Sequence, residues 1–594
     1  MTPRVASLLA GALCIAAATR AAAQAEADTT ARRDTTTAAD TAAADTLPAF
    51  LPTFAAPIRP GPLPLGSRYT FTADSLLFTN ARTLSDLLRH IPGVYVVRGG
   101  GYGQAEVVLY GGRGPAALEV FWDGFPYVPL GRDSVYLDPA RIPLAPLERV
   151  DVVILPAQLQ VYLVSARTRS TAPLTQVGIV TGDQDIAEYR GGYAKRTRSG
   201  FGIAFLYDQN SIRGSEANTT SEFTTADIAI TAEYIPPGGR VGASFQMLTA
   251  SWSREPTADA RVIGWKQQRR ERRLRFFVAE RSDGLGYRLE GTLATSEADG
   301  DSLVPNRMVS GAVLAVSRTW RRANLVASAQ LGAAGLPSEF AARAGWLPVS
   351  WLTLAASARH RAYGGGRSGQ RAHVTAGLAL PFGFSARAEL AWRRDVQAPL
   401  VRTDGRQAAV DVAGWLRFDQ PWLQVEVGRG IRDPFTPLDF ARGISTVDRL
   451  SPTPRTEFLA GHATLRPLPG VSLSAWHFDP FVGGGDFEPP HQTRVAATFH
   501  SKFWRVFRSG VFTLRGEVAI ESWSSWGLGG LDSAGVRRSL NGATFVETTL
   551  ELQLVGATIF WIIRNVNGMR GSYVYGLGYP KNTQLYGARW YFTN

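Results

Sequence analysis

The sequence predicts a mainly β protein: a transmembrane antiparallel β-barrel of about 22 strands, with an N-terminal α+β plug domain inside the lumen. Three observations predict this fold class. The chain opens with an export signal, a short region of mixed helix and strand signals follows, and apolar and polar residues alternate through the rest. The 594 residues are 45% hydrophobic, and beyond the first residues no apolar run is long enough for a membrane helix.

Residues 1–25 have the form of a secretory signal peptide. Arg4 precedes an apolar stretch, and Ala23-Gln24-Ala25 offers small residues for cleavage. The only cysteine, Cys14, lies inside this segment, so we expect a mature chain without disulfides or thiolate metal sites. The net charge of +13 would suggest a nucleic-acid partner in a cytoplasmic protein. Export argues against nucleic acid and leaves anionic ligands, anionic lipid headgroups or a solvated surface.

Residues 26–66 are expected to form a linker. Residues 26–47 have almost no large apolar side chains and cannot bury enough surface to offset chain entropy, so we expect disorder there. The Pro-rich stretch LPAFLPTFAAPIRPGPLPLG follows and is expected to be extended. Ordered structure is expected from near Arg68.

Residues 67–172 carry the signals of the small α+β domain. In TLSDLLRHIPGV, Thr83 and Asp86 have capping-box spacing, leucines follow on one helical face, and Pro92-Gly93 ends the helix. Asp123-Gly124 predicts a tight type I′ hairpin turn. Short strands are expected at Val94–Val97, Ala105–Tyr110, Leu118–Trp122, Arg149–Ile154 and Gln160–Ser165.

The stretch GGGYGQAEVVLYGGRG, residues 99–114, is unusually rich in glycine. A dinucleotide-binding loop would place its glycines between a strand and a helix. Here the glycines lead into the strand-like AEVVLY. We therefore expect these glycines to adopt positive φ angles and to allow close backbone packing, and we do not expect them to bind phosphate.

Residues 173–594 repeat with a period of two. The alternation is clear at residues 352–359, 372–380, 384–393, 423–428, 548–554 and 586–592. Either soluble sandwiches and propellers or a membrane barrel would produce it. One face carries Arg, Glu, His, Gln and Thr in nearly every strand, and the other is rich in Ala, Leu, Val and Trp. This composition favours an apolar outer face and a wet interior. A lumen of this width needs a plug, and residues 67–172 are the candidate.

Several stretches match a known pattern: TLSDLLRHIPGVYV, GGGYGQAEVVLYGGRG, LEVFWDGFPY, IPLAPLERVDVV and QVYLVSARTR, followed at the end of the chain by GLGYPKNTQLYGARWYFTN. On these stretches the chain resembles the TonB-dependent outer-membrane receptors, with a plug domain and a closing barrel strand near Phe592. It departs from that family at Tyr110-Gly111-Gly112, where an Ile-Arg-Gly is usual, and after the Glu-Arg-Val motif, where the sequence is contracted to LPAQLQVYL. No TonB box is recognisable in residues 26–66.

The resemblance implies a bacterial outer-membrane protein that takes up a scarce solute, anionic or a metal chelate, through a gated lumen. It also implies contact with outer-membrane lipid, with TonB, and with the barrel-assembly machinery through the C-terminal strand. The alternatives are a non-transporting barrel whose vestigial plug serves surface binding or a structural role, and a secreted soluble β protein. No catalytic motif is visible, so neither enzyme activity nor a cofactor is expected.

The resemblance further implies that Glu148 and Arg149, together with Arg113, seat the plug against the barrel wall. An ordinary ion pair at the start of a strand is the alternative for Glu148 and Arg149. Asp123 and Arg132 are expected to be structural or to face the ligand vestibule.

The basic run WKQQRRERRLRFF, residues 265–277, should place Arg273 and Arg275 in the lumen if Leu274, Phe276 and Val278 face outward. A basic lumen would concentrate anions. A solvated strand end is the alternative.

The loop HFDPFVGGGDFEPPH contains five groups that could bind a hard cation. Their spacing matches no defined metal motif, so a mobile polar loop is the favoured interpretation and no metal site is assigned. The five are His477, Asp479, Asp486, Glu488 and His491.

Overall fold

The computed structural model describes residues 49–54, 62–79, 81–98, 103, 105–111, 113–131, 135–212, 222–256, 264–301, 306–402, 404–442, 446–448, 450–482, 490–503, 506, 511–526, 539–571 and 582–593. The signal peptide and the segment expected to be disordered lie outside these residues. Residues from Ala49 onward belong to one structural unit. In the described part of the chain, no helix has the length and apolar character of a membrane span.

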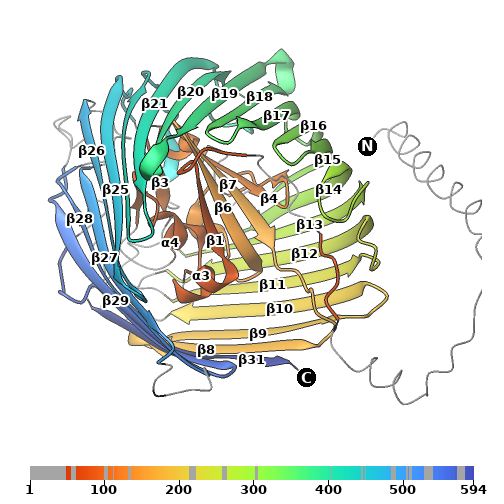
Figure 1. The fold of residues 1–594 in the computed structure, drawn as a ribbon, viewed down its shortest axis with the longest axis vertical. Helices are drawn as coiled ribbons and strands as arrows, with labels where there is room; N and C mark the ends of the chain where they lie inside the picture. The colour runs from red at the N-terminus through yellow and green to blue at the C-terminus, as the bar shows by residue number, and fades with distance from the viewer. Residues whose placement is uncertain are drawn as a thin grey trace, which may run out of the picture. The chain divides into compact units, whose positions relative to one another are not determined.

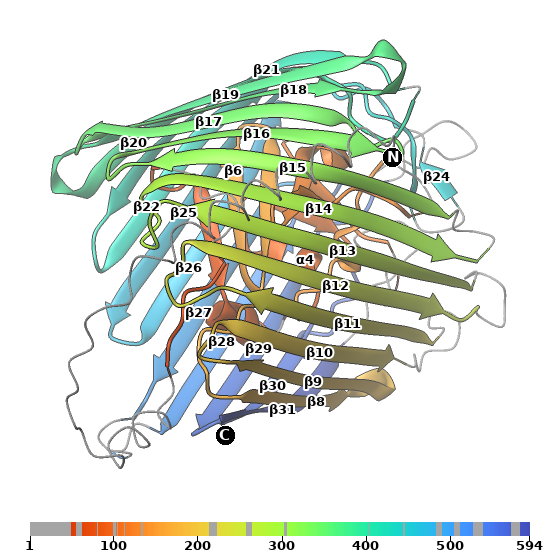
Figure 2. The ribbon, with the colours of Figure 1, turned by 90° about the vertical axis from the view of Figure 1, so that its right-hand side faces the viewer.

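A closed barrel of 22 antiparallel strands, β8–β22 and β25–β31, makes up most of this unit, as the sequence predicts (Figures 1 and 2). Chain neighbours pair throughout, and β31 pairs with β8 to close the wall. Closure satisfies every strand edge, which a lipid environment requires. The strands are β8 Leu174–Gly182, β9 Ile186–Arg196, β10 Phe201–Ile212, β11 Phe223–Tyr234, β12 Val241–Arg254, β13 Trp265–Ala279, β14 Gly286–Gly300, β15 Arg307–Thr319, β16 Ala323–Ala333, β17 Ser338–Val349, β18 Leu352–Ala362, β19 Ser368–Ala379, β20 Phe384–Asp395, β21 Gln407–Asp419, β22 Leu423–Arg432, β25 Thr456–Leu468, β26 Val471–Val482, β27 Gln492–Ser501, β28 Phe512–Trp523, β29 Ala543–Leu554, β30 Ala557–Arg564 and β31 Thr583–Thr593.

The alternation along each strand has the sidedness of a membrane barrel. On β20, Leu390 is 47% exposed on the outer face, whereas its neighbour Glu389 is 2% exposed and faces inward. The same inversion holds on β13, where Leu274 and Val278 face outward. Because the apolar stripes do not pack against each other, the wall is not the core of a soluble sandwich.

The two rims of the barrel differ. At one rim the strands join through short turns, and large aromatic side chains are exposed on the outer face there. At the other rim the connections are longer, such as residues 524–542 between β28 and β29. Outer-membrane barrels have short periplasmic turns and aromatic girdles, so the short-turn rim is the periplasmic one. The exposed aromatic residues at this rim are Phe201, Tyr234, Tyr287, Trp320, Trp346, Trp351, Phe382, Phe384, Trp422, Trp590 and Phe592.

The plug lies within the barrel wall, where Figure 1 shows its sheet and helices enclosed by the strands. Its five-stranded sheet has the order β1-β6-β7-β4-β5, and β2 and β3 form a separate pair. Leucines of α4 pack with valines of β6 and β7 in the main apolar core. The elements are β1 Arg68–Thr72, α3 Ala73–Phe78, α4 Leu84–Leu88, β2 Val94–Val97, β3 Val107–Tyr110, β4 Leu118–Trp122, β5 Phe125–Pro126, β6 Leu147–Leu155 and β7 Gln158–Ser165. A small outer hairpin, β23 Phe440–Arg442 and β24 Thr446–Asp448, completes the strands.

Local sequence signals in the plug have mixed outcomes. The hairpin turn is confirmed, because Asp123 and Gly124 adopt φ angles of 48° and 85° between β4 and β5. The capping box is wrong. The Thr83 side chain makes no cap hydrogen bond, and Asp86 instead accepts one from the backbone N–H of Arg82 at 3.1 Å. Asp86 also pairs with Arg98 at 2.9 Å, which draws the carboxylate away from the helix start.

The expected use of glycine is confirmed at two described positions. Gly111 has φ 57°, and a Cβ there would overlap the guanidinium of Arg432 on the wall. Gly103 has φ 78°, and a Cβ there would overlap the ring of Phe223. Plug backbone passes so close to barrel side chains at these points that only glycine fits.

The outward face yields a first prediction. Leu314 lies midway along β15 and is exposed on the outer face. Leu314→Arg should destabilise the folded protein in lipid vesicles, lowering its free energy of unfolding by about 2–4 kcal/mol, because arginine is costly at the bilayer midplane. Urea titration with gel-mobility readout measures this.

The matched control is Met308→Arg, which lies on the same outer face near the long-loop end of β15. Its cost should be about 0–1 kcal/mol, as expected near an interface. Equal effects at both positions would contradict the placement of the bilayer.

Candidate functional site: the plug–barrel interface

Charged side chains join the plug to the wall. Among the described residues, seven ion pairs cross the interface, and they are distributed over strands from β9 to β29 rather than gathered at one patch. The plug and the wall each contribute both carboxylates and arginines to these pairs, so neither surface carries charge of a single sign. The pairs are Arg82–Glu188, Arg89–Glu547, Arg113–Asp411, Asp123–Arg275, Glu119–Arg359, Glu119–Arg361 and Asp74–Arg515.

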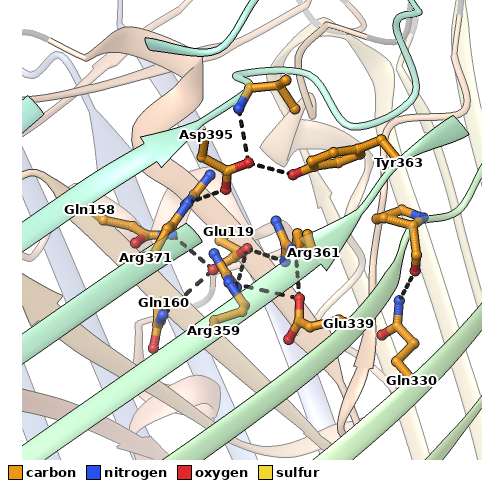
Figure 3. A network of polar contacts seen from close by, with 12 residues as sticks. Glu119, Gln158, Gln160, Gln330, Glu339, Arg359, Arg361, Tyr363, Arg371 and Asp395 are labelled. Atoms are coloured by element: carbon orange, nitrogen blue, oxygen red, sulfur yellow. Dashed lines mark hydrogen bonds and ion pairs between the residues drawn. The ribbon is translucent and has the colours of Figure 1, made fainter. Parts of the chain in front are cut away.

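Glu119 on β4 is the centre of the densest of these contacts (Figure 3). Its carboxylate accepts hydrogen bonds from Arg359 at 2.7 Å and from Arg361 at 2.8 Å, both on β18. On the plug side, Gln158 donates to the same carboxylate at 2.8 Å, because β7 runs beside β4. The plug carboxylate is therefore held by two arginines of one wall strand, β18, and Glu339 of β17 in turn pairs with Arg361.

The electrostatics of the plug carboxylates follow from these partners. Burial alone would raise the pKa of Glu119, but Arg359, Arg361 and Arg371 outweigh it and hold the pKa well below its usual range. For Asp86, burial is likewise opposed by Arg98 and by further guanidiniums, so its pKa is also lowered. Both groups belong to the plug and are ionised at neutral pH.

Arg113 is placed at the wall. Its guanidinium pairs with Asp411 of β21, donates to the carbonyl of Pro434 at 3.4 Å, and lies over the ring of Phe435 at 5.3 Å. The side chain is buried. Arg113 thus joins the plug to β21 of the wall.

Glu148 and Arg149 are placed differently from the expectation. Glu148 accepts from Arg167 Nε at 2.8 Å and from the Arg167 backbone N–H at 3.1 Å, whereas Arg149 pairs with Asp151 at 3.0 Å. These contacts lie within the chain segment of the plug, because β6 is flanked by β1 and β7 on both edges. Among the described wall residues, none forms an ion pair with either side chain.

Asp123 and Arg275 are brought together. Arg275 Nη1 lies 3.5 Å from Asp123 Oδ1, and Ser165 donates to the same carboxylate at 2.5 Å. This contact lies toward the short-turn rim and not at the long-loop vestibule, since Arg275 is near the β13 end that joins β14 by a short turn. Arg273 also faces the lumen, with its guanidinium 4.9 Å from the ring of Trp122. Arg132 lies outside the described residues.

Phe54 forms an anchor that the sequence does not predict. The ring is 2% exposed and packs on Ile235 and Phe277 at the short-turn rim. Arg167 donates to the Phe54 carbonyl, and Arg196 of β9 donates to the Pro52 carbonyl at 2.6 Å. Residues 49–54 of the Pro-rich stretch are therefore bound to the wall. Aromatic residues in an otherwise linker-like segment were the available signal.

Aromatic rings gather beneath the long-loop rim. Tyr95 of β2 lies 4.9 Å from Trp526 and 5.9 Å from Trp523, and Phe545 stacks on Trp523 at 5.0 Å. On the opposite part of the wall, the guanidinium of Arg141 lies 3.9 Å from a ring of Trp265. Such rings and cations can stack on flat or anionic ligand groups.

The polar loop after β26 is only partly described. His491 Nδ1 lies 2.7 Å from Asp479 Oδ1, and His477 Nδ1 lies 2.7 Å from Thr493 Oγ1. Asp486 and Glu488 lie outside the described residues. Among the residues that are described, no group of three or more His, Cys, Asp or Glu could hold a metal ion.

Residues 65–161 match the family model of the TonB-dependent receptor plug domain. This match falls on the sheet and helices that the wall encloses. The chain therefore combines a plug domain of the TonB-dependent receptor family with a closed barrel of 22 strands. Proteins of this type are located in the bacterial outer membrane and are not enzymes. No curated protein sequence matches the chain.

Solved structures of receptors and transporters share the fold at low sequence identity. A variant of the ferric enterobactin receptor PfeA of Pseudomonas aeruginosa is 12% identical, with a TM-score of 0.69 over 89% of this chain and 98% of that one. The FrpB iron transporter of Neisseria meningitidis is 9% identical, with a TM-score of 0.69 over 89% and 99%. The copper transporter OprC is 12% identical, with a TM-score of 0.68 over 86% and 96%.

The Glu119 contact yields a prediction for plug stability. Glu119→Gln leaves Arg359 and Arg361 without their shared plug carboxylate, so the free energy of opening this contact should fall by about 3 kcal/mol. Faster backbone hydrogen exchange in β4 measures it. The control is Asp283→Asn on the exposed β13–β14 turn, where Asp283 contacts Arg281 and the backbone N–H of Leu285; β4 exchange should not change. Unchanged β4 exchange in Glu119→Gln would show that the contact does not hold the plug.

A pH dependence follows from the lowered pKa values of Glu119 and Asp86. Because the folded values lie below the unfolded ones, the stabilisation is complete above about pH 5 and is lost as the pH falls below about 4. The thermal midpoint in detergent should therefore be flat from neutral pH to about 5 and then fall. In the double variant Glu119→Gln, Asp86→Asn the fall should be smaller, and an equal fall would refute the assignment.

Proposed function

We propose that the protein carries out gated uptake of a scarce solute across the outer membrane into the periplasm. The observation that carries the proposal is the way in which the plug is seated. Discrete ion pairs cross the interface, including those of Arg89, Glu119 and Arg113. Polar interfaces between domains permit relative motion, whereas a large dry interface does not. A plug held in this way closes the lumen and still moves when its contacts are exchanged.

Space between plug and wall supports a route for the solute. A cavity of about 410 Å³ lies near the short-turn rim, lined by Trp122, Arg167, Gln246 and Arg273 among others. A cavity of this volume falls in the range of small-molecule sites. Rearrangement of the neighbouring plug strands would extend it along the wall, so the whole plug would not have to leave the lumen.

The groups beneath the long-loop rim support a proposed solute class. Tyr95, Trp523 and Trp526 form a buried aromatic cluster, and Arg141 places a guanidinium beside tryptophan rings, so a solute would meet these groups once the plug moves. Planar and anionic groups suit both. We therefore propose an anionic solute or a metal chelate. The similar structures support this solute class, since those proteins are named as a ferric enterobactin receptor, an iron transporter and a copper transporter.

TonB is the proposed source of energy, and residues 49–54 are where a pull on the preceding chain would first be felt. Outer-membrane lipid is the proposed partner of the apolar outer face. The C-terminal strand β31 presents Tyr586, Trp590 and Phe592 outward and is the proposed signal for the barrel-assembly machinery. A non-transporting barrel with a vestigial plug is the second candidate, and the lack of a recognisable TonB box favours it.

Uptake of labelled metal chelates and organic anions tests the proposal, in cells that express the protein with and without an active TonB. We expect surface binding in both strains and accumulation only with TonB. Cells without the protein give the background. Equal surface binding without accumulation in either strain would refute transport and support the second candidate.

A further inference from the structure

A second, smaller cavity lies between the plug and the opposite part of the wall. It has a volume of about 60 Å³ and is lined by the β6–β7 hairpin of the plug and by strands β17–β21. Gln158 and Gln160 reach it from the plug, and Figure 3 shows them beside Arg359 and Arg371. The wall contributes Arg343, Arg359, Arg371, His373 and Arg393.

Positive charge exceeds negative charge around this cavity. Four carboxylates near the cavity each form an ion pair with at least one arginine. They are Glu119, Glu339, Asp395 and Asp411. Their partners are Arg359, Arg361, Arg371 and Arg113. Arg343 and Arg393 remain, and neither forms an ion pair with a described carboxylate. Arg343 lies 5.3 Å from the ring of Tyr162 and interacts with the hydroxyl of this residue, and Arg393 lies 5.3 Å from the ring of Phe435.

Unused hydrogen-bond donors accompany this surplus charge. Arg393 Nε and Nη2 are buried without an acceptor among the described residues, and so is Arg359 Nη2. The Arg359 side chain is only 9% exposed. A buried N–H without an acceptor is costly, so an anion that accepts from these nitrogens of Arg393 and Arg359 would stabilise the structure.

We propose that this cavity binds one small oxyanion between Arg343 and Arg393. The volume has room for about four waters, or for one tetrahedral oxyanion or carboxylate group. Guanidinium groups bind phosphate and carboxylate through paired N–H donors. Gln158 and Gln160 would supply amide donors from the plug. The bound anion thus joins the plug hairpin to the wall, and it does so whether or not the protein transports a solute.

Equilibrium dialysis of the full mature chain in detergent tests this site, with radiolabelled inorganic phosphate in chloride buffer at constant ionic strength. We expect saturable binding of one phosphate per chain. Arg343→Gln combined with Arg393→Gln should weaken binding by at least about tenfold, because two charge-assisted contacts are lost. Arg394→Gln, on the neighbouring exposed side chain of β20, should bind phosphate as the wild type does.

Labelled acetate, dialysed in parallel, distinguishes the sources of the oxyanion. Saturable binding of phosphate alone assigns the site to phosphate-like dianions, and binding of both probes assigns it to any small oxyanion. Absence of saturable binding of either probe to the wild type overturns the proposal, even if the double variant fails to fold. Equal phosphate binding in a folded double variant and in Arg394→Gln also overturns it.

Discussion

Lipid outside the wall governs the rest of this structure. Since hydrocarbon offers no hydrogen bonds, the sheet must close, and each strand must direct its apolar side chains outward. Most polar side chains of the wall then point into one enclosed space. Leu390 and Glu389 on β20 illustrate both halves of this constraint. Anything that fills the lumen must therefore match a charged surface, and the plug does so with carboxylates and arginines of its own.

The plug is consequently two kinds of structure at once. Its interior is an ordinary apolar core, with α4 packed on β6 and β7. Its surface is an internal protein–protein interface in which buried charges are paired across the gap. Buried pairs add little net stability compared with apolar packing, but breaking one is costly. The main effect of such an interface is to fix the plug in one position, and its net contribution to stability is small.

The fold could be predicted from the sequence because the signals that specify strands and turns are periodic and local. The period of two in β13 and β20 predicts which side chains face the lumen, and Asp123-Gly124 predicts its turn from two residues. The interface was not predictable in the same way. Glu119 meets Arg359 and Arg361 across some 240 positions of chain, and no local pattern relates them. Glu148 and Arg149 illustrate the reverse case: a family motif indicated wall contacts, but neighbouring plug strands cover that edge.

The anchor at Phe54 determines how tension would travel through the molecule. Residues 49–54 are attached to Arg196 and Phe277 of the wall and to the connection that leads into β8. The barrel is embedded in the bilayer, so this attachment transfers a force on the preceding chain to the barrel wall before it reaches the plug. A weak force on the preceding chain acts on the wall, and only a force large enough to remove the Phe54 ring from its site acts on the plug. Thermal fluctuations of the preceding chain would then leave the lumen closed.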